Sequence, residues 1–345
     1  MSGFLQQKTL GLFVKTNGAL SQWFYGGLGR IFVFHRVLPK EKHYPLFGAN
    51  GMAVSPQYLD WFIPFVKEQG FEFISLDEMH KRLLAGKSTK PFAVITIDDG
   101  WLDNLTYGLP VFEKHQVPFA IYVTNCFAEH TAVLWAETLE RFLLANTSLQ
   151  FTFMGEVFIY SFETVEARRK VFNQIRSFVL NASSLEEYNE RIASFIKLMP
   201  PAEEGAFALN HAQIAQLAAH PLCTIGAHTV NHLPLAKLSA EDAFNEISLS
   251  KQKVAAITGK EVKHFAYPYG TANECNTREF AMAAKAGYAT AVTGRPANVF
   301  AQHNQHLMAI PRFSIGEATN AERLKYILNG ILHFSFNGFK KVVTE

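Results

Sequence analysis

Short β-prone runs alternate with helical segments from about residue 31 onward, and this alternation limits the chain to few folds. Ser55-Pro56 is a typical helix start, and Gly70 and Gly86 are typical helix ends. Such a rhythm is typical of a parallel α/β barrel or a layered parallel sheet, so we expect an α/β fold. The β-prone runs lie at 31–34, 71–74, 93–97, 119–123, 224–227, 264–266 and 289–292.

Residues 135–205 interrupt this alternation. The runs 150–153 and 157–161 predict a β-hairpin, and two amphipathic helices are expected to follow it, over 164–181 and 184–199. We interpret 135–205 as a helical and hairpin insertion into a main domain of residues 31–319, covering the substrate cleft. Residues 320–345 are expected to form a C-terminal helix and tail.

Composition excludes several classes of protein. A hydrophobic fraction of 48% and a charged fraction of 18% suit a packed globular protein. A net charge of +2 without a Lys/Arg run gives no reason to expect a nucleic-acid partner. The three cysteines are odd in number and widely spaced, which favours a reducing compartment, so we expect a cytoplasmic location.

The first 30 residues mix large apolar side chains with basic ones. They lack the uninterrupted apolar core of a signal peptide and the roughly 18 apolar residues of a bilayer span. Two readings stay open for this N-terminal extension. It is either a helix docked on the domain or a helix lying on a membrane surface, which would hold the protein at the inner membrane face.

Asp98 and Asp99 follow the run 93–97, which is too apolar for a half-solvated strand and predicts a central buried one. In parallel α/β folds, active sites gather at the carboxyl ends of strands. Gly100 permits a bend there, so one carboxylate can bind a metal while its neighbour faces the substrate. The alternative is an ordinary turn in which Asp99 caps the next helix.

His228 and His232 follow the run 224–227. Imidazoles four positions apart lie on one side of a helical turn or tight loop. A distant carboxylate would complete three ligands with an open coordination position, which describes a catalytic metal site. The alternative is a surface or hydrogen-bonded histidine pair. We therefore predict a metal-dependent hydrolase.

Three segments resemble the motifs of the polysaccharide deacetylases, the NodB-homology or carbohydrate esterase family 4 group. Thr96-Ile-Asp-Asp-Gly100 is similar to T-F-D-D-G, and His228-Thr-Val-Asn-His232 matches H-[S/T]-x-x-H. Ala266-Tyr-Pro-Tyr269 is similar to R-x-P-Y. Their order and spacing match the family from about residue 31 to 315.

The resemblance implies a distorted (β/α) barrel of about seven parallel strands and a divalent metal, most commonly Zn²⁺. It implies removal of N-acetyl groups from aminosugars, a step of carbohydrate metabolism in cell-surface polysaccharide biosynthesis. Asp98 would be the general base, and the Tyr269 backbone N–H would help to stabilise the oxyanion. The implied metal ligands are Asp99, His228 and His232.

The chain departs from the family pattern at two places. Ala266 stands where the third motif has an arginine, and the late L-x-H motif that supplies the catalytic acid is absent as written. We hypothesise that Arg312 replaces the arginine beside Asp98 and that His306 is the acid, with His303 in reserve. The alternative is a solvated loop with a structural arginine.

The roles of three further residues remain open. His35 ends the run 31–34 and is either a core histidine or a substrate contact, while Trp135 and Glu137 are candidate sugar contacts. The expected substrate is an N-acetylated glycan or its lipid-linked sugar precursor. Two other functions stay open: removal of another small acyl group, such as formyl, from a lipid-linked aminosugar, and glycan binding without catalysis.

Overall fold

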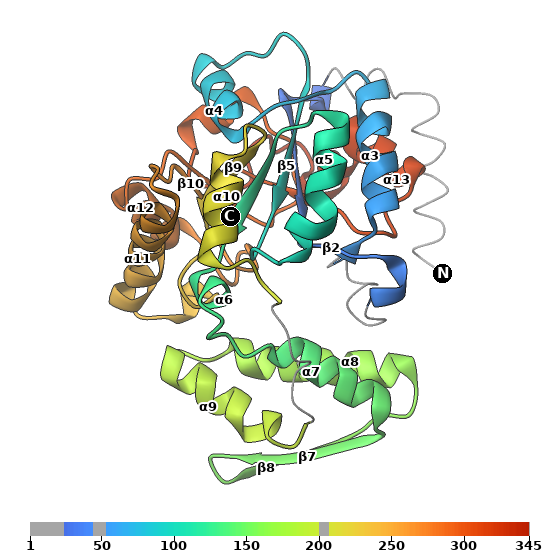
Figure 1. Cartoon of the computed structure of the whole chain (residues 1–345), viewed down its shortest axis with the longest axis vertical. Coiled ribbons are helices and arrows are strands. Elements are labelled where there is room, and N and C mark those ends of the chain that lie inside the picture. Colours follow the sequence, from blue (N-terminus) through green and yellow to red (C-terminus); the bar gives the residue numbers. More distant parts are fainter. Residues whose placement is uncertain (1–23, 44–52, 200–206, 345) are drawn as a thin grey trace.

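The computed structural model describes residues 24–43, 53–199 and 207–344. Its main body is a curved sheet of seven parallel strands in the order β11-β10-β9-β6-β5-β1-β12, and an eighth, β4, pairs with the start of β5. This half-barrel confirms the expected distorted (β/α) barrel of about seven parallel strands (Figure 1). The strands are β1 (Gly29–Phe34), β4 (Glu72–Phe73), β5 (Phe92–Ile97), β6 (Phe119–Val123), β9 (Cys223–Ala227), β10 (His264–Ala266), β11 (Thr290–Val292) and β12 (Phe313–Ser314).

Strand β5 is central, as its sequence predicted. It pairs with β1 on one side and with β6 on the other, and all six of its residues are buried. Side chains alternate between the faces of a strand. Ala93, Ile95 and Ile97 therefore join the larger apolar core, while Phe92 and Val94 join a second one. Burial on both faces explains why this strand is continuously apolar.

Helices cover the outside of the sheet (Figure 1). The first, α3, begins as its sequence predicted, because the Ser55 hydroxyl accepts a hydrogen bond from the Tyr58 N–H and Pro56 takes the first helical position. The helices are α3 (Pro56–Glu68), α4 (Leu76–Ala85), α5 (Leu109–His115), α6 (Asn125–Ala128), α10 (His211–Ala219), α11 (Ala240–Thr258), α12 (Thr277–Lys285), α13 (Ala321–Leu328) and α14 (Ile331–Asn337).

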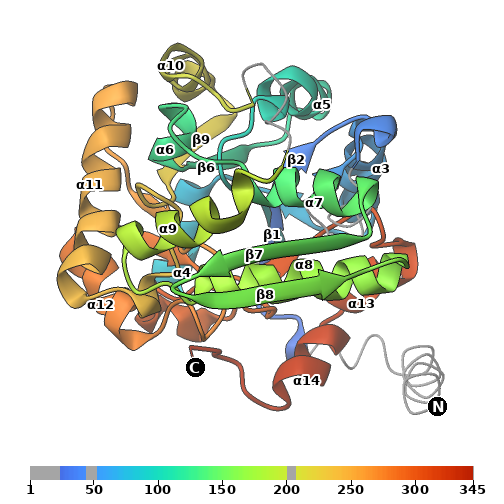
Figure 2. The same ribbon diagram turned by 90° about the horizontal axis from the view of Figure 1, so that it is seen from below.

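The insertion that interrupts the alternation of strands and helices forms a separate layer below the barrel in Figure 1. Figure 2 shows this layer across the end of the barrel. The expected hairpin and two helices are present, preceded by a further helix. These elements are α7 (Trp135–Ala145), β7 (Ser148–Phe153), β8 (Glu156–Ser161), α8 (Val165–Leu180) and α9 (Leu185–Ile196). They share an apolar core of their own, which includes Leu139, Phe172 and Phe195.

The described beginning and end of the chain contact each other: the Tyr25 ring lies 5.1 Å from the ring of Phe334, and Arg30 donates to the carbonyls of Ile327 and Leu328. The expected C-terminal helix is present as α13 followed by the shorter α14. Residues 1–23, most of the expected N-terminal extension, lie outside the described residues, as do residues 200–206 of the insertion. Among the described residues no helix is both long and apolar enough to cross a bilayer.

Candidate active site at the carboxyl ends of the strands

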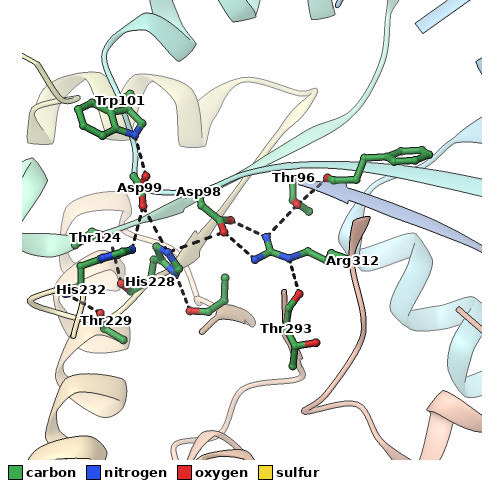
Figure 3. A network of polar contacts seen from close by, with 12 residues as sticks. Thr96, Asp98, Asp99, Trp101, Thr124, His228, Thr229, His232, Thr293 and Arg312 are labelled. Carbon is green, nitrogen blue, oxygen red and sulfur yellow. Dashed lines mark hydrogen bonds and ion pairs between the residues drawn. The ribbon is translucent and has the colours of Figure 1, made fainter. Parts of the chain in front are cut away.

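Asp99, His228 and His232 meet below the sheet, although about 130 residues of chain separate the aspartate from the histidines (Figure 3). Asp99 follows β5 and His228 follows β9. One ligand atom from each of the three residues lies within 4.8 Å of the others. The Asp99 Oδ1 lies 3.5 Å from His228 Nε2 and 3.3 Å from His232 Nε2. The structure thus brings together the three residues predicted as ligands.

Neighbouring groups hold these three side chains in an orientation that suits a cation. The His228 Nδ1 bonds to the Ala266 carbonyl at 2.7 Å, which directs its Nε2 toward Asp99. The Trp101 Nε1 donates to Asp99 Oδ2 at 2.9 Å, while the buried Asp99 Oδ1 has no hydrogen-bond partner. An orphaned carboxylate oxygen beside two imidazole nitrogens fits a divalent metal, and partners behind the ligands are typical of metal sites.

The ionisation states also fit a metal. Burial lowers the pKa of His228 to about 4, so its imidazole is neutral near pH 7. Burial alone would raise the pKa of Asp99, but the close approach of His232 and the attraction of the other nearby histidines outweigh it and leave that pKa well below its usual range. A neutral imidazole and a charged carboxylate are the forms that bind metals.

The backbone at this site is strained. Four of the seven non-glycine residues with positive φ in the described ranges lie here: Asp99 (77°), Thr229 (67°), His232 (56°) and Tyr269 (60°). Such conformations cost of order 1–3 kcal/mol each and persist where the surroundings impose them. For the β-branched Thr229 the conformation is especially unfavourable. The strain is concentrated in the segments that carry the predicted ligands, and Asp99, His232 and Tyr269 line the cavity described below.

Glu246 on α11 holds the loop that carries both histidines. Its carboxylate accepts the backbone N–H groups of Val230 and Asn231 at 2.9 and 2.8 Å, and the Asn231 side-chain amide at 2.6 Å. The His232 N–H donates to the Thr229 hydroxyl at 3.0 Å. This buried carboxylate therefore fixes the distance between the two imidazoles.

Asp98 and Arg312 form a buried ion pair beside the three ligands (Figure 3). The guanidinium meets both carboxylate oxygens at 2.7 Å, and it also donates to the Thr293 carbonyl and the Thr96 hydroxyl. Burial alone would raise the pKa of Asp98, but Arg312 and, more weakly, His228 hold it below its usual value. Arg312 thus occupies the place beside Asp98 that the sequence predicted, just before β12.

The structure does not bring His306 or His303 to the cavity, and here the prediction of the acid was wrong. Both residues lie in or next to the 3₁₀ turn Ala301–Gln305. Val299, just before this turn, pairs with Gly29 at the first residue of β1, at the opposite end of the strand from the site. His306 is exposed, and the buried His303 bonds to the backbone of Phe300.

Besides the two predicted ligands, the histidine that lies at the cavity is His35 and not His306, which the sequence had suggested. His35 follows the last residue of β1 and lines the cavity, and its buried Nδ1 has no hydrogen-bond partner. The nearby His35 side chain contributes to the lowered pKa of both Asp98 and Asp99. The signal was its position directly after a buried β-prone run, the same position that drew attention to Asp98.

The site opens into a cavity of about 550 Å³ between the barrel and the insertion. Tyr269 lines it with its ring, 4.8 Å from the ring of His232. Glu137, a candidate sugar contact, also lines it, and burial raises the pKa of its carboxyl. The insertion lines the cavity with Trp135, Phe172, Arg176, Leu185, Tyr188 and Ile192.

Known structures share this fold. The Streptococcus pyogenes deacetylase PplD in complex with acetate aligns with a TM-score of 0.58 at 17% identity, over 87% of this chain and 97% of that one. IcaB from Ammonifex degensii gives 0.54 at 15%, over 88% and 98%. A de-N-acetylase from Aggregatibacter actinomycetemcomitans gives 0.55 at 14%, over 87% and 99%.

Sequence comparison gives a second, independent match. No curated protein sequence matches the chain significantly. Residues 176–291 match the profile of the family described as polysaccharide deacetylase, and this stretch contains both His228-Thr-Val-Asn-His232 and Ala266-Tyr-Pro-Tyr269. The profile match in a chain of this fold confirms the predicted resemblance: residues 176–291 carry the sequence pattern of a polysaccharide deacetylase domain, and the solved structures share the fold.

Proposed function

We propose that this chain removes N-acetyl groups from aminosugars of a polysaccharide or its lipid-linked precursor, and that it requires a divalent metal, which the ligand types indicate to be zinc. The observation that carries the proposal is the pair of aspartates: Asp99 offers an unpartnered oxygen between two imidazoles, and Asp98 stands beside it as a charged carboxylate. Two histidines and a carboxylate suit Zn²⁺.

Asp99, His228 and His232 would hold the ion. When bound, such an ion lowers the pKa of a water molecule and polarises a carbonyl group. Asp98 is the general base that accepts the proton of the attacking water, and Arg312 keeps this carboxylate charged and oriented. The Tyr269 N–H, which has no backbone acceptor among the described residues, donates to the oxygen on which negative charge develops.

The departing amine needs a proton, and His35 is the residue we assign to this step. It is half-buried in the cavity wall near both aspartates, and its buried Nδ1 has no hydrogen-bond partner. An imidazole is a suitable acid because its ordinary pKa lies near neutral pH. His35 replaces His306 in the proposed mechanism.

We also propose that the main domain comprises residues 31–319, that residues 135–205 form a lid-like layer over the substrate, and that the enzyme works in the cytoplasm at the inner membrane face. Apolar residues of the insertion in the cavity wall, such as Leu185 and Ile192, support an amphiphilic substrate. The mixed aromatic and basic residues 1–30 support contact with a membrane surface.

Acetate release tests the proposed activity. The purified chain is incubated with N-acetylated oligosaccharides, sugar phosphates and their N-formyl counterparts, with and without a chelator. We expect acetate release that the chelator abolishes and added zinc restores, and we expect Asp98→Asn to lose turnover while still binding zinc. Faster release of formate would indicate the deformylase alternative, and glycan binding without release of either acid would indicate a binding protein.

A further inference from the structure

Arg176 is a cation of the insertion that faces the reaction cavity. It lies on α8, is half-buried, and lines the same cavity as Asp98, His228 and His232. Its guanidinium carbon stands 5.2 Å from the centre of the Tyr269 ring, and the same ring lies 4.8 Å from the ring of His232. Arg176 and a predicted metal ligand therefore contact the same aromatic ring.

Among the described residues Arg176 has no acidic partner, unlike the two other arginines that line the cavity. Arg36 pairs with Asp103, and Arg312 pairs with Asp98. For Arg176 the described part of the chain provides a contact with the Tyr269 ring but no ion pair. A guanidinium that is partly removed from water and has no counter-charge is suited to bind an anionic ligand group through two parallel hydrogen bonds.

Part of the wall of this cavity is apolar and partly exposed. Val133 and Leu185 both line the cavity, and they remain 53% and 40% exposed. Large apolar side chains that stay exposed at the mouth of a cavity mark a surface that binds apolar groups. The cavity thus combines the reaction centre, the Arg176 cation and an apolar rim formed by Val133 and Leu185.

We propose that Arg176 binds a phosphate attached to the N-acylated sugar, so that the substrate is a sugar phosphate whose phosphate also carries an apolar chain along Val133 and Leu185. This inference rests on the proposed deacetylase function. A phosphate matches the guanidinium in charge and geometry, and an apolar carrier on that phosphate matches the rim. Arg176 then acts as a specificity-determining residue and takes no part in proton transfer.

Binding to the metal-loaded Asp98→Asn variant tests this step without turnover. The probes are N-acetylglucosamine 1-phosphate, its uncharged methyl glycoside, a disaccharide with a uronic acid, and a prenyl diphosphate-linked N-acetylglucosamine. In this background, Arg176→Gln should weaken binding of both phosphate probes roughly tenfold to a hundredfold, the range expected for a lost charged hydrogen bond. The methyl glycoside should change by less than about threefold.

Controls separate recognition of charge from a structural role. Arg176→Lys should restore part of the phosphate affinity, and Lys170→Gln, an exposed charge change on the same helix, should have no effect. In the active protein, Arg176→Gln should raise KM for the phosphate substrates and leave kcat nearly unchanged. If the prenyl-linked probe binds no better than the 1-phosphate, the apolar rim has no role in recognition.

Three results would overturn the proposal: no preference of the parent protein for phosphate over the methyl glycoside, equal loss of both in Arg176→Gln, or a stronger effect on the uronic acid disaccharide. Failure of the deacetylase proposal looks different. In that case no probe yields acetate from the active, zinc-loaded protein, while the binding comparison still reports on Arg176.

Discussion

Replacing Arg312 with methionine should be strongly destabilising. Met retains much of the apolar length of the side chain but removes the charge that faces Asp98. The two side chains are 2% and 4% exposed, and two N–H···O bonds of 2.7 Å join them. Removing one partner of a buried ion pair typically costs about 3–5 kcal/mol, because the other charge stays buried without compensation. We expect a loss of this size in Arg312→Met.

A double-mutant cycle measures whether the pair accounts for that loss. Urea unfolding of the zinc-free protein would be followed for Arg312→Met, Asp98→Asn and the double variant. Either single change leaves one partner unmatched, whereas the double change removes both charges. We therefore expect the double variant to lose less stability than the two single changes together, by at least about 2 kcal/mol.

The catalytic consequence follows from the same contacts. Arg312 touches none of the three predicted metal ligands by a hydrogen bond, so Arg312→Met should still bind zinc while its turnover falls by about a hundredfold or more. Losses of stability that add within about 0.5 kcal/mol, together with normal turnover, would refute the argument that Arg312 holds Asp98 charged and in place.

Other substitutions test the remaining parts of the site. His35→Gln should lower kcat by about 10²–10⁴-fold without changing zinc affinity, as measured by steady-state kinetics and zinc titration, and an unchanged kcat would exclude it as the acid. Trp101→Phe removes the 2.9 Å bond to Asp99 and should weaken zinc binding by roughly 10–100-fold, measured by competition with a chelator. Glu246→Gln should also weaken zinc binding, because the histidine loop loses a charged acceptor of two N–H groups; unaltered affinity in either variant would contradict its supporting role.

The local sequence was sufficient to predict where the proposed base and metal ligands lie in the fold. The buried run before Asp98 could only be a central strand, and a strand end in a parallel sheet is where side chains of different strands meet. The same reasoning applied to His228 after its own run. These predictions succeeded because each depended on one strand and its immediate neighbour in sequence.

Arg312 was harder to predict, because nothing in its own neighbourhood indicates a partner more than 200 residues away. The hypothesis arose because Ala266 stands where the family motif has an arginine. Ala266, at the end of β10, contacts His228 through its backbone carbonyl. The arginine reaches Asp98 because β12 pairs with β1, which in turn pairs with β5. Strand order of this kind is a property of the whole sheet.

The prediction that His306 is the catalytic acid failed for a related reason. Sequence proximity to Arg312 suggested a shared site, but the chain between them runs along the length of the barrel. The turn that carries His306 packs near α4 at the end where β1 begins, whereas Arg312 lies near the opposite end. Side chains six residues apart can thus stand at different ends of a sheet, because each extended residue advances by about 3.3 Å.

No pattern in the sequence indicated that Arg176 lies at the cavity. It lies in an amphipathic helix with several other basic residues, and only the packing of the insertion across the barrel brings it to the cavity. Long-range packing between two separate apolar cores determines that position, and helix periodicity carries no information about it.

The central claim is that Asp99, His228 and His232 share one metal ion. X-ray absorption of the zinc-loaded protein tests it most directly, by reporting the atoms bound to zinc and their distances. The account predicts one zinc per chain with only nitrogen and oxygen neighbours at about 2.0–2.2 Å, including the scattering of two imidazoles, and a loss of this signal in His228→Ala. A sulfur neighbour at about 2.3 Å, or an unchanged spectrum in His228→Ala, would contradict it.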